Sequence, residues 1–109
     1  MANDNEIQEV VAMLQKFDLL TVDKNYSYEQ LHSSIAEKVN FLITNNFSRF
    51  ISVLYQVDIS EKKLRTALIN TSDLPSATII ATMIIERQLQ KIETKKVFKN
   101  TGVSDEEKW

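Results

Sequence analysis

The sequence lacks cysteine, and it has one glycine, one proline and one histidine. Without cysteine the chain can form no disulfide, thiolate zinc site or cysteine nucleophile. Glycine-rich phosphate loops are excluded as well, because Gly102 is the only glycine among 109 residues. Tight β-hairpins commonly use Asn-Gly turns, and no such pair occurs. With 43% hydrophobic residues, these absences favour an all-helical protein.

The residue types that carry catalysis are also too few for the common arrangements of nucleophile and base. His32 has only Glu29 nearby on its own helical face, whereas a metal site needs several ligands. No serine lies in a GxSxG setting, and no HExxH pair occurs. We therefore expect a structural or surface role for His32, no enzymatic activity, no metal and no cofactor.

Net charge and chain length limit the partners, the location and the number of domains that can be expected of the protein. The net charge is −2, which gives no overall attraction to nucleic acid or to a membrane surface. The first residues, MANDNEIQEVV, lack the basic and apolar regions of a signal peptide. The longest apolar stretch is shorter than the roughly 20 residues that span a bilayer. We expect one cytoplasmic domain over residues 1–98, followed by a flexible tail over 99–109.

The stretch from Pro75 to Phe98 organises the chain, because it carries the longest run of helical signals. Asp73 is suited to the N-cap position, which places Pro75 in the first turn. Residues 77–85 are apolar nearly all round the helix axis, with only Thr78 and Thr82 marking a more polar strip, and this pattern is typical of a buried helix. From Glu86 onward the apolar stripe narrows, so this half should lie along the surface. The sequence thus predicts a long, largely buried C-terminal helix.

Four earlier helices follow from apolar spacing. The predicted helices are 3–17, a second from 27 to the Asn45-Asn46 pair, a third over 47–57, and a short fourth ending near residue 69. Ser27 and Gln30 have the spacing of a capping box, and either Asp58 or Ser60 can cap the short helix. The Asn45-Asn46 pair ends or bends the second helix, so the second and third could also be continuous. The predicted fold class is a compact all-α bundle of about five helices.

A chain this small can hardly enclose a helix that is apolar on all sides, and a symmetric partner is the common remedy. We therefore expect a non-enzymatic interaction module that associates with itself as a homodimer or with another protein. Phe41 falls off the main apolar stripe of its helix. The predicted interaction surface comprises Arg87, Gln88, Lys91 and Phe41.

Segregated basic residues support an alternative. Lys62, Lys63 and Arg65 crowd the short helix, and the segment 47–69 can be interpreted as a helix-turn-helix with residues 57–60 as its turn. In this alternative the protein is a DNA-binding transcriptional regulator. The turn lacks glycine and the chain is acidic overall, whereas DNA-binding domains are usually basic, so DNA binding is the second hypothesis.

Two segments resemble a family of short bacterial helical proteins of the Bacteroidetes type, whose function is unknown. Residues 45–65 and 84–92 carry an LYxxDxSExKL-like segment followed by an IIxRQLQK-like helix. The matching residues are Leu54, Tyr55, Asp58, Ser60, Glu61, Lys63, Leu64 and the stretch 84–91. The resemblance covers about half of the chain. It implies a bacterial, cytoplasmic helical domain and transfers no catalytic residue.

Overall fold

The computed structural model describes residues 4–20, 26–71 and 73–100. They form five helices and, within these ranges, no strand, so the predicted all-α bundle is confirmed. The helices are α1 Asp4–Lys16, α2 Tyr28–Asn45, α3 Phe47–Gln56, α4 Glu61–Asn70 and α5 Ser76–Asn100. Residues 99 and 100 of the predicted tail thus belong to α5, and the rest of the tail, 101–109, lies outside the described residues.

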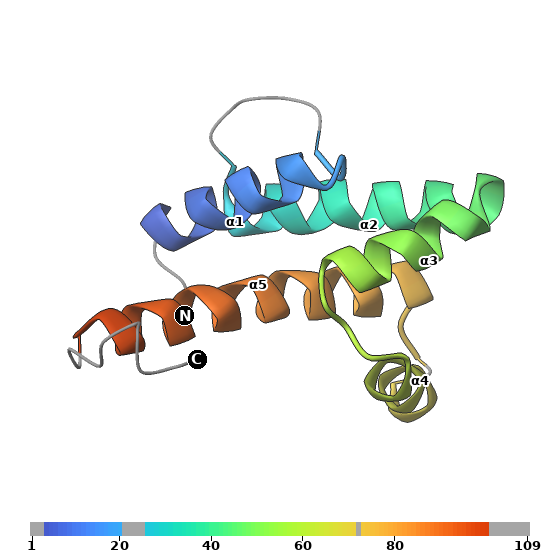
Figure 1. Ribbon diagram of the computed structural model, residues 1–109. Helices are drawn as coiled ribbons and strands as arrows, with labels where there is room; N and C mark the ends of the chain where they lie inside the picture. Colours follow the sequence, from blue (N-terminus) through green and yellow to red (C-terminus); the bar gives the residue numbers. More distant parts are fainter. Residues whose placement is uncertain (1–3, 21–25, 72, 101–109) are drawn as a thin grey trace.

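Helix α5 is the element against which most of the others pack. It contacts α2 along much of its length, and it also contacts α1 and α4, while α3 packs on α2. Figure 1 shows α5 running beneath α1 and α2, with α4 near its N-terminal end. Burying one helix against three neighbours places its apolar side chains in the single core of the domain.

The burial of α5 changes along its length. Every side chain from Ala77 to Ile85 is buried or half-buried, as the apolar pattern predicts. Beyond Ile85 the helix exposes one side, on which Glu86, Gln90 and Glu93 lie. The prediction that the C-terminal helix is largely buried is therefore not confirmed, because its half from Glu86 onward lies along the surface.

The start of α5 differs from the prediction. The helix begins at Ser76, and the Pro75 carbonyl accepts the first backbone bonds, from Thr78 N at 3.0 Å and Ile79 N at 3.2 Å. Pro75 is therefore the N-cap residue of α5, the position that was predicted for Asp73. Proline suits this place because it has no N–H to leave unpaired at the helix start.

The other predicted helix starts are set by short polar side chains. Ser27 and Gln30 form the predicted capping box, with reciprocal bonds of 3.1 and 3.0 Å. Asn46 separates α2 from α3: its backbone N–H ends α2 on Leu42 O, and its side chain accepts from Arg49 N at 3.2 Å. Its extended φ of −156° breaks the helical path, so α2 and α3 are not continuous.

Candidate functional site

Helices α1 and α3 end in the same way, with an aspartate in the left-handed conformation. Asp18 and Asp58 have φ of 66° and 65°. After α3, Ile59 N donates to Leu54 O at 3.1 Å and Asp58 N donates to Tyr55 O at 3.2 Å, and α1 repeats both bonds. This is the Schellman motif, whose left-handed position usually holds glycine. In a chain with one glycine, aspartate takes this position because it tolerates the left-handed region better than most residues.

An arginine from another helix binds the end of α3. Arg87 of α5 contacts the Asp58 carboxylate at 2.6 Å through Nη2 and donates to the Asp58 carbonyl through Nε at 3.2 Å. Its Nη1 donates to Gln90 Oε1 at 2.8 Å, so all three guanidinium nitrogens have an acceptor. A cation suits this place because a helix C-terminus carries partial negative charge.

The end of α1 has a looser version of the same arrangement. Arg49 of α3 donates to the Phe17 carbonyl at 3.2 Å, and its Nη2 lies 3.9 Å from the Asp18 carboxylate. The long second distance, to a carboxylate that is itself largely exposed, indicates a weak ion pair. The Arg87–Asp58 pair is therefore the better defined of the two.

Gln88, next to Arg87, binds the neighbouring carbonyl of the same helix end. It was predicted at the surface, but its side chain is fully buried, so that prediction is wrong. Its Nε2 donates to Val57 O at 3.0 Å, while its Oε1 has no partner within the described residues. Consecutive residues of α5 thus satisfy consecutive carbonyls at the end of α3, which would otherwise remain unpaired. This contact fixes the position of α3 along α5.

The hydrogen bond and positive charge of Arg87, with a smaller contribution from Lys91, lower the pKa of Asp58. A carboxylate whose pKa is lowered by folding stabilises the protein above its unfolded pKa, and this contribution is lost as the pH falls through the folded pKa. We expect Asp58→Asn to lower the melting temperature at neutral pH, with the difference from wild type shrinking under acid conditions.

Asparagine also tolerates the left-handed conformation, so Asp58→Asn leaves the turn intact and isolates the charge. Asp73→Asn, at an exposed loop position, is the matched control. Thermal unfolding followed by circular dichroism at several pH values measures the effect. A constant difference between Asp58→Asn and wild type at every pH would contradict the role of the carboxylate charge.

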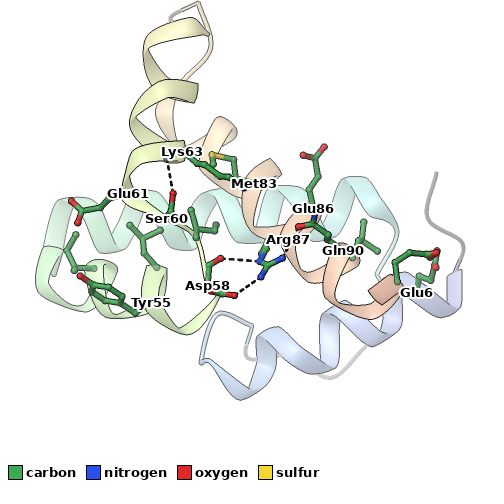
Figure 2. Close-up of a pocket in the computed structure, with 15 residues that line it drawn as sticks. Glu6, Tyr55, Asp58, Ser60, Glu61, Lys63, Met83, Glu86, Arg87 and Gln90 are labelled. Carbon is green, nitrogen blue, oxygen red and sulfur yellow. Dashed lines mark hydrogen bonds and ion pairs between the residues drawn. The ribbon is translucent and has the colours of Figure 1, made fainter. Parts of the chain in front are cut away.

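An open groove of about 1050 Å³ surrounds the Arg87–Asp58 pair. Figure 2 shows this pair between Tyr55 and Glu61 on one side and Glu6 on the other. The apolar residues that line the groove are Ile51, Leu54, Ile59, Met83 and Leu89. Tyr55 at its edge is 73% exposed, the largest exposure among the large hydrophobic residues described. The groove thus combines apolar surface with a polar edge.

The charged residues of the groove are mainly acidic. Arg87 and Asp58 offset one another, which leaves four glutamates against one lysine. These residues are Glu6, Glu61, Glu86, Glu93 and Lys63. Glu86 and Glu93 lie seven residues apart on one face of α5, with Gln90 between them. The groove therefore carries local negative charge along α5.

The structure does not bring the predicted interaction residues together. Arg87 lines the groove. Lys91 helps to lower the pKa of Asp58 but does not line the groove, and Gln88 is buried in the core. Phe41 lies on α2, 55% exposed, with Lys38 Nζ 5.8 Å from its ring centroid. Tyr55, Glu86 and Glu93, none of them in the predicted interaction surface, are exposed residues that line the groove.

The predicted nucleic-acid residues all lie on α4. Lys62, Lys63 and Arg65 are exposed. Arg65 Nη2 lies 3.8 Å from Glu61 one turn earlier, and Lys63 lines the acidic groove. Helix α4 packs principally against α5 rather than against α3. A helix-turn-helix pairs its two helices closely, so this packing does not resemble that motif.

His32 links α2 to α5. Its Nε2 lies 2.8 Å from Thr82 Oγ1, and the Thr82 hydroxyl donates to Thr78 O at 3.1 Å. With the Thr82 hydroxyl donating to Thr78, Oγ1 can accept a hydrogen bond from His32 in the tautomer that carries its hydrogen on Nε2. Nearby, burial raises the pKa of the Tyr28 phenol, and the charges of Glu86 and Glu29 raise it further. His32 thus joins two helices, and among the described residues no acid or histidine cluster is suited to hold a metal.

In the described ranges, no helix has both the length and the apolar character needed to cross a membrane. No protein-family model, curated protein or solved structure matches the chain. The resemblance to the short bacterial proteins therefore stays a prediction from residues 45–65 and 84–92.

Proposed function

We propose that this protein is a non-enzymatic protein-binding module, and that its binding surface is the groove between α3, α4 and α5. The observation that carries the proposal is the apolar floor of the groove beside Tyr55, a strongly exposed aromatic residue at its edge. Tyrosine is enriched at protein interfaces, where its ring is buried while its hydroxyl keeps a polar contact. A bacterial, cytoplasmic setting is part of the proposal: the bacterial origin rests on the resemblance of residues 45–65 and 84–92, and the cysteine-free composition fits a cytoplasmic location.

The shape of the groove favours an amphipathic helix as the bound segment. Helices border it, and a helix presents apolar residues along one stripe and polar residues along the other. Such a segment would place its apolar stripe on Met83, Leu89 and Ile51 and keep its polar face toward the solvent.

Self-association was the first hypothesis from the sequence, and the argument for it is now a different one. From Ile79 to Ile85 the apolar residues of α5 are largely covered within one chain, so they no longer call for a second copy. A homodimer would instead use the groove. Light scattering measures this directly: a dimer that Tyr55→Asp converts to a monomer would assign the groove to a second copy.

Fluorescence anisotropy tests the proposal with a dye-labelled amphipathic helical peptide of mixed charge. We expect this peptide to bind the wild-type chain and to bind Tyr55→Ala roughly tenfold more weakly, because a buried interface tyrosine is often a hot spot. Phe41→Ala, at an exposed site outside the groove, should bind the peptide as the wild type does. No binding to the wild-type chain, or equal losses in both variants, would overturn the groove as the binding surface.

DNA binding is the second candidate, and the exposure of Lys62, Lys63 and Arg65 is the observation that favours it. Phosphate contacts make binding strongly dependent on salt. Duplex DNA that binds at low salt, and is lost when these three residues are changed to glutamate, would favour this alternative. The acidic groove next to α4 opposes it, because its glutamates repel phosphate.

A further inference from the structure

From the charge of the groove we infer that its partner is a basic amphipathic helix. This inference rests on the proposed function and adds the chemistry of the partner. Glu61 is already paired with Arg65 at 3.8 Å, so the inference rests on Glu86 and Glu93, which lie on the exposed side of α5. Apart from Arg87, Lys63 is the one cation among the described residues that line the groove. Arg87 does not offset them, because its charge is already engaged by Asp58 at 2.6 Å. A cationic segment is attracted to such a surface and an acidic one is repelled.

The positions of Glu86 and Glu93 define the spacing of the partner's charges. Seven residues of a helix rise about 10.5 Å, so the two glutamates lie two turns apart along α5. A partner helix lying along α5 would meet them with two lysines or arginines that are also seven residues apart. Its apolar residues between these cations would lie over Leu89, and an apolar residue one turn beyond the cation at Glu86 would lie over Met83.

An acidic partner fits these contacts poorly. Only Lys63 of the groove would face it with an available positive charge, because Arg87 would have to leave Asp58 and Gln90. Breaking these charge-assisted bonds costs more than a rim contact returns. The arrangement of Arg87 thus removes a cation from the groove and leaves the glutamates to select the partner.

Two matched dye-labelled peptides test the inference on the unmodified full chain, with binding followed by fluorescence anisotropy. Each has about 18 residues, because shorter isolated helices are marginal in water. One carries two lysines seven residues apart beside a leucine stripe, and the other carries glutamates at the same two positions. We expect the lysine peptide to bind and the glutamate peptide to bind at least tenfold more weakly. Equal binding of both would overturn the basic partner and leave the proposed function standing, whereas binding of neither would overturn both.

Groove variants identify the side chains responsible. The double variant Glu86→Gln/Glu93→Gln should weaken binding of the lysine peptide roughly threefold to tenfold, since rim ion pairs are modest. The loss should shrink at high salt, because exposed charges are screened. Glu37→Gln, at an exposed position of α2 outside the groove, is the control. Unchanged affinity in the double variant, with its helical circular dichroism intact, would overturn the assignment to these glutamates.

Discussion

Ile84→Ala is expected to lower the free energy of unfolding by about 2–5 kcal/mol, the range measured for large-to-small changes in protein cores. Ile84 is fully buried in α5, within residues 77–85, where every side chain is buried or half-buried. The variant loses the transfer free energy of the removed methyl groups and leaves a cavity that neighbouring helices fill only in part. For a domain whose total stability is about 5–15 kcal/mol, this is a large fraction.

Ile69→Ala is the matched control, because it makes the same chemical change on α4 at a position that is 71% exposed. Its stability should stay within about 0.5 kcal/mol of wild type. Urea unfolding followed by circular dichroism gives both values, and an unchanged denaturant slope shows that the midpoint shift reflects stability alone. Equal losses at both positions would contradict the central place of α5 in the core.

The features that the sequence predicts well depend on neighbouring residues. The buried half of α5 was predictable because residues 77–85 leave no polar face wide enough for solvent. The capping box at Ser27 was predictable because both partners lie three residues apart. In each case the interacting groups are a few residues apart, so their spacing carries the information.

Asp58 shows where local signals become ambiguous. Aspartate is favoured both as an N-cap and in the left-handed conformation, so its position before α4 was open to two interpretations. Ser60 takes the cap, with its Oγ 3.0 Å from Lys63 N, and Asp58 takes the left-handed turn. A nearby serine that can cap is the only sequence signal for this outcome.

The position of the groove and the burial of Gln88 depend on contacts between residues that are far apart in the sequence. The groove is lined by Tyr55 and Asp58 at the end of α3 and by Glu93 of α5, and the two segments are brought together by tertiary packing and not by sequence spacing. Gln88 follows two charged residues in a stretch that reads as surface, and glutamine is usually exposed. Its burial is set by where α3 ends, 31 residues earlier, and no local pattern encodes that distance.

Gln88→Glu is expected to destabilise the protein by about 3–5 kcal/mol at neutral pH, the cost typical of an uncompensated buried charge. The carboxylate would replace the amide that donates to Val57 O, so two acceptors would face each other in a buried site. Gln90→Glu is the control, because it makes the same change two residues away on the exposed side. There the new carboxylate still accepts from Arg87 Nη1, so stability should hold or rise slightly.

The pH dependence of Gln88→Glu distinguishes buried charge from lost packing. Burial raises the folded pKa of the new carboxyl above its unfolded value of about 4.3. Between these two pKa values the folded state keeps a proton that the unfolded state has released, so stability falls as the pH rises. Toward pH 4 the protonated glutamic acid can donate to Val57 O as the amide does, and most of the loss should disappear. This trend is opposite to that of Asp58, whose carboxylate stabilises the same helix end only while it is charged. A loss that is independent of pH would mean that Gln88 acts through its shape alone.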